Sequence, residues 1–311
     1  MLLNVARIAI SVGLLAWVIS RAGLNQLLEA ARQADPRPYA LAIVLAVLGI
    51  IIRAYRWQIL LKAVGARLSF RRAVYLYFVG SFFNTFLPTG FGGDVVRVLE
   101  IGEGATSEQA AGTVVVDRLT GFLALFLLAL AALPFAGGLL PRATAWLIAA
   151  MAGAVTLGSL LLFEGRILRW LTSRLPRALS PAGDAWLGKT YGVITACGAR
   201  ALAGAVGVSL VFNLAQVSAN VLAARALGMT VSAWTFFLFV PVATAALLVP
   251  ISISGFGVRE GIYVTLFAQV GVGAAQAVAL SLASYSLDLA CGLLGGVIYF
   301  AAGLMGLRQR T

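Results

Sequence analysis

Long apolar runs are the feature of this chain that most restricts how it can fold. Helices are expected over residues 2–20, 37–63, 110–135, 143–163, 201–227 and 275–305, with shorter apolar segments at 73–88, 233–250 and 256–271. A helix of about 20 apolar residues crosses a hydrocarbon core of roughly 30 Å. Inside a bilayer, the backbone must satisfy its hydrogen bonds within helices or closed barrels. The runs therefore predict an all-α, polytopic helical bundle, with residues 1–311 forming one transmembrane domain.

Composition supports a membrane protein and argues against an enzyme. Hydrophobic residues make up 61% of the chain and charged residues 11%, whereas soluble domains carry about 25% charged residues. No long polar stretch is left for a soluble catalytic domain. The run at 2–20 contains Arg7 and ends in Val18-Ile19-Ser20, which lacks the small residues of a signal-peptide cleavage site. We therefore expect it to be a retained first helix.

The net charge of +12 is explained by membrane topology. The basic residues are scattered among the apolar runs, which argues against nucleic-acid binding, and loops on the cytoplasmic side are commonly enriched in lysine and arginine. The chain has no histidine, and its two cysteines, Cys197 and Cys291, lack the spacing of a metal site. No metal, cofactor or disulfide is expected.

Two strongly basic segments, 62–72 and 164–200, should both be cytoplasmic. If residues 73–88 crossed the membrane fully, segment 164–200 would lie outside. A re-entrant hairpin that enters near Ala73, turns at 88–93 and leaves near Glu100 satisfies both segments. The same reasoning places both chain termini in the cytoplasm, in a protein of the cytoplasmic (inner) membrane.

A short motif occurs twice in the chain. Residues 87–97 and 249–259 each contain a proline, then Gly-Phe-Gly, then an arginine, and each follows an apolar run. Proline and glycine break helices. If 233–271 is a second hairpin, it enters from the opposite side. The halves 38–163 and 201–305, joined by the basic connector 164–200, would then form an inverted repeat. Two alternatives remain: residues 233–271 could form two full spans, or the similarity of the two motif copies could be due to chance.

The doubled motif supplies most of the candidate binding residues. An arginine beside a helix break in apolar sequence is costly unless it has a function, and arginine binds phosphate in a bidentate manner. A helix that starts at 92–94 would also direct its positive end at an anion. The candidates for contact with a phospholipid head group are Asn84, Gly90, Gly92, Gly93, Asp94 and Arg97 in the first copy, and Ser252, Ser254, Gly255, Gly257, Arg259 and Glu260 in the second.

Each candidate also has a structural alternative. Arg97 could extend to the membrane interface or pair with Asp94 or Glu100. Asn84 and the two serines of the second copy could instead bond backbone groups freed by the helix breaks.

Three further charged residues lie in apolar helices. Arg118 could complete the anion site, while Asp117 could line it or neutralise one of the arginines. Asp288 is the one acid of the last helix and should face inward, because a buried carboxylate is costly. Pairing with arginine and proton or ion coupling stay open for Asp117 and Asp288.

Two polar sets have a favoured structural interpretation. Arg56 is expected to anchor its helix at the cytoplasmic interface, and Arg53, which lies deeper, is a weaker candidate for function. Asn213, Gln216 and Asn220 share one helical face and are expected to bond neighbouring helices.

Several of these residues also form a familiar series. Arg56-Trp57, Asn84 with Leu87-Pro88, Gly93-Asp94 with Arg97, and Val-Val-Asp-Arg-Leu at 115–119 resemble the lysylphosphatidylglycerol synthase transmembrane-region family, also called flippase-like. The family includes the flippase half of the multiple peptide resistance factor and stand-alone relatives linked to polyprenyl, dolichyl and hopanoid lipids. The resemblance implies a lipid-translocating protein. By position, Arg97, Asp117 and Arg118 would line the lipid path.

Two departures from the family qualify this resemblance. Many relatives have Gly-Glu where this chain has Gly93-Asp94, which leaves the type of acid open. Larger relatives continue into a soluble aminoacyltransferase domain, whereas this chain ends at Thr311, so we do not expect it to make the aminoacyl lipid itself.

The function expected from the sequence is a flippase for an anionic lipid, such as an aminoacyl-phospholipid or a polyprenyl-phosphate-linked lipid. The alternative is a membrane enzyme or accessory subunit in polyprenyl-linked glycan or hopanoid synthesis. The expected partners are membrane lipids with anionic head groups, with a separate lipid-synthesising enzyme and a second copy of the chain left open. Arg97→Ala is predicted to abolish translocation without unfolding the protein.

Overall fold

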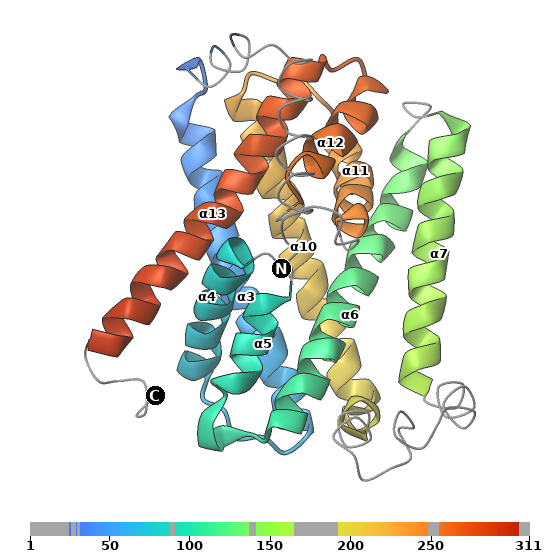
Figure 1. The fold of residues 1–311 in the computed structure, drawn as a ribbon. Coiled ribbons are helices and arrows are strands. Elements are labelled where there is room, and N and C mark those ends of the chain that lie inside the picture. The colour runs from blue at the N-terminus through green and yellow to red at the C-terminus, as the bar shows by residue number, and fades with distance from the viewer. Residues whose placement is uncertain are drawn as a thin grey trace, which may run out of the picture.

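The computed structural model describes residues 25, 29, 32–87, 91–136, 141–164, 192–247 and 255–304. All regular elements in this part of the chain are helical (Figure 1). Five of the described helices are long and apolar enough to cross a membrane: α3 (Pro36–Ala63), α6 (Ser107–Ala132), α7 (Arg142–Glu164), α10 (Gly198–Ala226) and α13 (Ala274–Leu304). The other described α-helices are shorter: α4 (Phe70–Phe86), α5 (Gly92–Leu99), α11 (Ala233–Ala246) and α12 (Val258–Ala268). The polytopic helical bundle is thus confirmed.

Some predictions fall on other parts of the chain. The expected first helix 2–20, most of the connector 164–200, and the candidates Gly90, Ser252 and Ser254 lie outside the described residues.

Local sequence signals set where the long helices begin. At α3, the Asp35 side chain accepts a hydrogen bond from the Arg37 amide at 2.9 Å, and Pro36 occupies the first helical position. At α6, Thr106 and Gln109 close a reciprocal capping box over the first turn. Both helices therefore start within a few residues of the position expected from the apolar runs.

The helices α4 and α5 form a hairpin whose two ends lie at the same end of the bundle. The Arg67 amide, just before α4, donates to the Gly104 carbonyl at 2.7 Å. The Arg72 guanidinium, in the first turn of α4, donates to the Glu100 carbonyl, just after α5, at 2.7 Å. The hairpin occupies the lower half of Figure 1. Its course confirms the hairpin predicted from the charge of the flanking loops.

Backbone contact holds this hairpin closed. A Cβ atom added to Gly93 would collide with the carbonyl oxygen of Gly80, so α4 and α5 pack main chain against main chain. The glycine at position 93 is therefore explained by helix packing.

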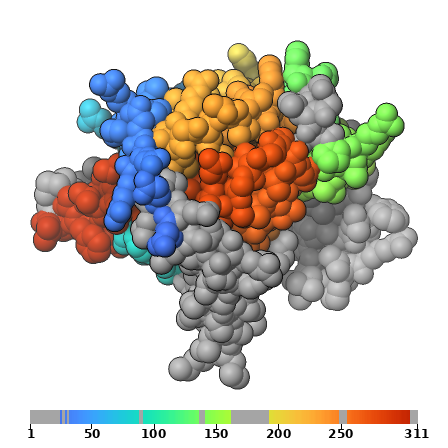
Figure 2. Space-filling model, turned by 90° about the horizontal axis from the view of Figure 1, so that it is seen from above, coloured from blue at the N-terminus to red at the C-terminus, as the bar shows by residue number. Residues whose placement is uncertain are grey.

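The helices α11 and α12 form the second hairpin, at the opposite end of the bundle. Trp234, at the start of α11, stacks on Phe135 with ring centroids 4.7 Å apart. Gln269, at the end of α12, accepts a hydrogen bond from the Thr144 hydroxyl at 2.9 Å. Phe135 and Thr144 flank the turn between α6 and α7, so both ends of this hairpin lie beside that turn. Seen from this end, it lies between the start of α3 and α7 (Figure 2).

The two halves repeat the same order of helices in opposite directions. A long helix, a short hairpin and a long helix follow each other in α3–α6 and again in α10–α13. The Asp35 amide donates to the Ala226 carbonyl at 2.8 Å, so the start of α3 meets the end of α10 and the two helices are antiparallel. This is the inverted arrangement expected if the second copy forms a hairpin, with α4 and α5 toward one end of the bundle and α11 and α12 toward the other (Figure 1).

Candidate anion-binding cavity

A cavity of about 400 Å³ lies where the two hairpins meet. Its volume falls within the range of about 300–1,000 Å³ typical of ligand sites. Side chains from both halves line it, and the charged ones are the five arginines Arg53, Arg56, Arg97, Arg118 and Arg259 and the three aspartates Asp94, Asp117 and Asp288. Arginines outnumber acids by two, so the cavity attracts anions.

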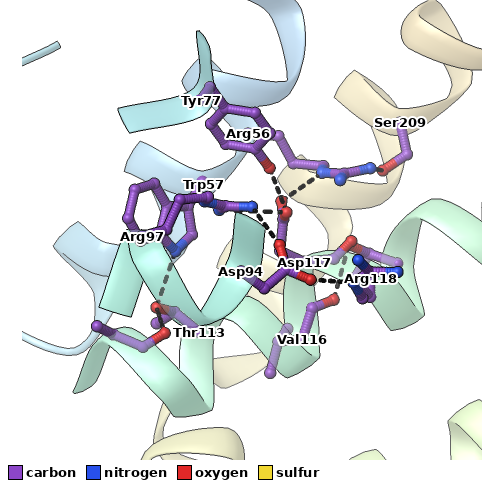
Figure 3. Close-up of polar contacts among 12 residues, drawn as sticks. Arg56, Trp57, Tyr77, Asp94, Arg97, Thr113, Val116, Asp117, Arg118 and Ser209 are labelled. Carbon is purple, nitrogen blue, oxygen red and sulfur yellow. Dashed lines mark hydrogen bonds and ion pairs between the residues drawn. The ribbon is translucent and has the colours of Figure 1, made fainter. Parts of the chain in front are cut away.

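Asp117, on α6, is the centre of a buried network (Figure 3). Its side chain is 2% exposed and accepts hydrogen bonds from Arg56 Nε at 2.6 Å and from the Tyr77 hydroxyl. Arg97 Nη2 lies 3.7 Å from the same carboxylate. Arg56 also donates to Ser209 Oγ of α10 at 2.8 Å. Asp117 therefore neutralises arginines and connects five helices.

Asp94, on α5, pairs with two arginines. Its Oδ1 accepts a hydrogen bond from Arg97 Nη1 at 3.1 Å, and its Oδ2 accepts one from Arg118 Nε. Arg97 is 4% exposed, and its Cζ lies 4.2 Å and 3.8 Å from the ring centroids of Trp57 and Tyr77. Arg97 therefore does not extend to the membrane interface; the alternative in which it pairs with Asp94 is the one observed.

Arg53 has no hydrogen bond or ion pair among the described residues, although it lines the cavity. Its Cζ lies 4.8 Å from the ring centroid of Phe212 and 5.7 Å from that of Tyr77. Aromatic faces stabilise a guanidinium without neutralising it. Arg53 thus supplies a positive charge with no ion-pair partner among the described residues, although the sequence made it only a weaker candidate for function.

The prediction for Arg56 was wrong. It is buried rather than anchored at an interface, because Asp117, which lies 61 positions away in sequence, meets it inside the bundle.

The second half contributes Arg259 and Asp288. Arg259 Nη1 lies 4.0 Å from Asp288 Oδ2, and Arg259 Cζ lies 4.9 Å from the ring centroid of Tyr285. The Asp288 side chain is 71% exposed and lines the cavity, whereas the side chain of Asp117, which also lines it, is 2% exposed. Of the two acids considered for proton or ion coupling, Asp288 is therefore the accessible one. The arginines of both motif copies share one cavity.

Asn84 has the backbone-bonding role considered for it, and its position also leaves it facing the cavity. It lines the cavity, and its Oδ1 accepts a hydrogen bond from the Gly93 amide at 2.8 Å. That amide is one of the unpaired donors at the start of α5. Gly92 and Gly93 are buried where α5 begins and do not line the cavity.

Glu260 does not line the cavity, which corrects its expected contact with substrate. It is 1% exposed and accepts hydrogen bonds from the Gly257 amide at 2.6 Å and the Ser281 hydroxyl at 3.2 Å. The carboxylate therefore closes a cap over the start of α12. Gly257, with φ of 79°, belongs to the same cap, while Gly255, with φ of 77°, lines the cavity.

The polar face of α10 bonds neighbouring helices, as expected. Asn213 Nδ2 donates to the Gly121 carbonyl of α6 at 3.1 Å, and Asn220 Oδ1 accepts a hydrogen bond from the Ser284 hydroxyl of α13 at 2.7 Å. Asn213 and Gln216 also line the cavity, so the same face contributes polar groups to its wall.

Comparisons with known proteins agree with this architecture. The model of the family described as "Lysylphosphatidylglycerol synthase TM region" matches residues 4–296. A UPF0104 membrane protein of Pyrococcus horikoshii is 29% identical over 116 residues, which are 36% of this chain and 35% of that protein. A UPF0104 membrane protein of Methanothermobacter thermautotrophicus is 32% identical over 114 residues, 36% of this chain and 34% of that protein.

The chain thus spans about a third of the length of these curated relatives. No solved structure gives a significant match. The family model covers nearly the whole chain, and the five candidate spans agree with a multi-pass membrane protein. The protein therefore belongs to the family of the lysylphosphatidylglycerol synthase transmembrane region.

Proposed function

We propose that this protein is a flippase that carries an anionic phospholipid across the cytoplasmic membrane, with the head-group phosphate held in the cavity. The observation that supports the proposal most strongly is the cavity itself, lined by five arginines and three aspartates between two oppositely directed hairpins. Ionisable groups inside a membrane protein are costly and usually mark a path for substrate or ions. Inverted repeats place such a site near the middle of the bilayer.

The arginines divide into two groups by their contacts. Arg56 and Arg97 are buried against Asp117 and hold the helices together. Arg53, Arg118 and Arg259 line the cavity with more accessible side chains, and are the residues proposed to meet the phosphate. Arginine suits this role because its planar fork binds two phosphate oxygens at once.

The orientation and partners are part of the same proposal. The basic loop 62–72 lies beside the open end of the first hairpin, and the positive-inside rule places that end in the cytoplasm. The protein is proposed to move the lipid without altering its covalent structure, so a separate enzyme would make the lipid.

Translocation by the purified protein tests the proposal. In proteoliposomes that contain acyl-labelled fluorescent phosphatidylglycerol, added dithionite should bleach label from both leaflets, whereas protein-free liposomes should keep the inner-leaflet label. Acyl-labelled glucosylceramide, which has no phosphate, is the matched control lipid and should stay protected.

Two results would count against the flippase. Protected phosphatidylglycerol would contradict the proposal directly, and equal bleaching of both lipids would contradict the role of the arginines. Incubation with labelled polyprenyl phosphate tests the enzyme alternative, because a covalently changed product would favour an enzyme over a flippase.

A further inference from the structure

We propose that Asp94 is an internal counter-anion. Its carboxylate pairs with Arg118 when no head group is bound and gives up Arg118 when a head group binds. This inference rests on the proposed function and deepens it, because it assigns the residue that sets affinity for the phosphate.

The contacts of Asp94 are those a phosphate would make. One carboxylate oxygen faces Arg97 Nη1 at 3.1 Å, and the other faces Arg118 Nε (Figure 3). The two guanidiniums come from different helices, α5 and α6, and converge on one small anion. Paired arginine forks of this kind bind carboxylate and phosphate oxygens alike.

The two arginines differ in their freedom to change partner. Arg97 is held between the rings of Trp57 and Tyr77 and lies 3.7 Å from Asp117, so it stays in place. Arg118 is 30% exposed, lines the cavity, and has its Cζ 4.5 Å from the ring centroid of Phe91, a half-exposed residue of the same wall. In an exchange of anions, Arg97 would keep its place and Arg118 would turn from Asp94 to the phosphate.

Asp117, in contrast to Asp94, is a permanent counter-ion of the arginines. It is 2% exposed and bonded to both Arg56 and Tyr77, so no ligand can replace it without dismantling the network. Asp94 also lines the cavity, with its side chain 10% exposed, but one of its partners is Arg118, which is 30% exposed. An anion in the cavity can therefore compete with Asp94 but not with Asp117.

Competition by Asp94 predicts weak binding by the wild type and tighter binding when its charge is removed. Isothermal titration of dihexanoyl phosphatidylglycerol into detergent-solubilised protein should show at least about tenfold tighter binding by Asp94→Asn, because the ligand no longer has to displace a charge-assisted contact to Arg118. The Asn side chain keeps the shape of Asp but no longer holds Arg118 by charge.

Two controls separate displacement from net charge. Asp288→Asn removes the same charge from the same cavity, but its arginine is Arg259 at 4.0 Å. It should tighten binding much less than Asp94→Asn. Glu103→Gln removes an exposed acid outside the cavity and should change nothing. A parallel titration with inorganic phosphate tests whether the ligand is a lipid head group or a free ion. If Asp94→Asn bound only inorganic phosphate more tightly, the site would belong to a free ion, which would contradict a lipid head group.

The outcomes separate this inference from the proposed function. The displacement of Asp94 would be overturned if the wild type bound the lipid and Asp94→Asn bound it no more tightly, or if Asp288→Asn gained as much affinity as Asp94→Asn. Either result would be compatible with the proposed flippase function. No binding by any variant, together with no translocation, would overturn both.

A structure of the wild type with the short-chain lipid bound tests the same point without a substitution that could impair folding. It should show phosphate on Arg118 and the Asp94 contact broken. An intact Asp94–Arg118 pair beside bound lipid would overturn the inference.

Discussion

Replacing Arg53 with glutamine is expected to slow phosphatidylglycerol translocation by at least about tenfold, because a lost charge-assisted hydrogen bond to phosphate raises the barrier by about 1.5–3 kcal/mol. Arg53 is the cavity arginine whose charge is not balanced by an acid among the described residues. Removing it leaves no carboxylate without a counter-ion, so the fold should be retained. The dithionite assay measures the rate.

Arg71→Gln is the matched control for Arg53→Gln. It removes one positive charge from an exposed position on α4 that does not line the cavity, and it should translocate lipid at the wild-type rate. Equal rates for wild type, Arg53→Gln and Arg71→Gln would show that the unbalanced charge plays no part in transport.

Arg97→Ala is a less specific test than the sequence suggested. Arg97 contacts both Asp94 and Asp117 and lies between two aromatic rings. Its removal leaves two buried carboxylates with fewer partners, which is strongly destabilising. We therefore still expect Arg97→Ala to lose translocation, but together with stability, and Arg53→Gln becomes the informative variant.

Asp117→Asn is expected to cause the largest loss of stability among the cavity variants, about 3–5 kcal/mol, the typical cost of breaking a buried ion pair by removing one partner. Arg56 would lose its 2.6 Å contact and Arg97 its second acid, and both side chains are only 4% exposed. Two like charges would then lie near each other without a carboxylate between them. Thermal unfolding of the purified protein, followed by size-exclusion chromatography in detergent, measures the effect.

Glu103→Gln is the control for this substitution, because it neutralises an acid at an exposed turn. Its melting temperature should equal that of the wild type. If Asp117→Asn also melted with the wild type, the network around Asp117 would not hold the helices together as the contacts indicate.

Much of the fold follows from the sequence because a membrane imposes few choices. Apolar length gave the long helices to within a few residues, and the basic loops 62–72 and 164–200 required the first hairpin to return to its starting side. The shared proline, Gly-Phe-Gly and arginine pointed to two equivalent breaks. These signals are local in sequence or depend on counts of charged residues, so they can be read without knowing how the helices pack.

The partners of individual charges did not follow from the sequence. Arg56 and Asp117 are 61 positions apart, and only the packing of α3 against α6 brings them together. The same packing leaves Arg53, one turn away on α3, without an ion pair in the part of the chain that the structure describes. Glu260 carried a readable signal, since a glutamate three residues after the start of a helix commonly caps it. Because Glu260 directly follows Arg259 in the second motif copy, it was predicted to contact substrate instead.

Photocrosslinking with a phosphatidylglycerol that carries a diazirine on its head group tests the central claim most directly. If the phosphate enters the cavity, mapped peptides should come from both halves, from α3 or α6 and from α13, and excess phosphatidylglycerol should suppress the labelling. Arg53→Gln should lower it in parallel with transport. Labelling confined to outward-facing positions such as Trp146 and Leu157 of α7, with none in the cavity, would contradict the account.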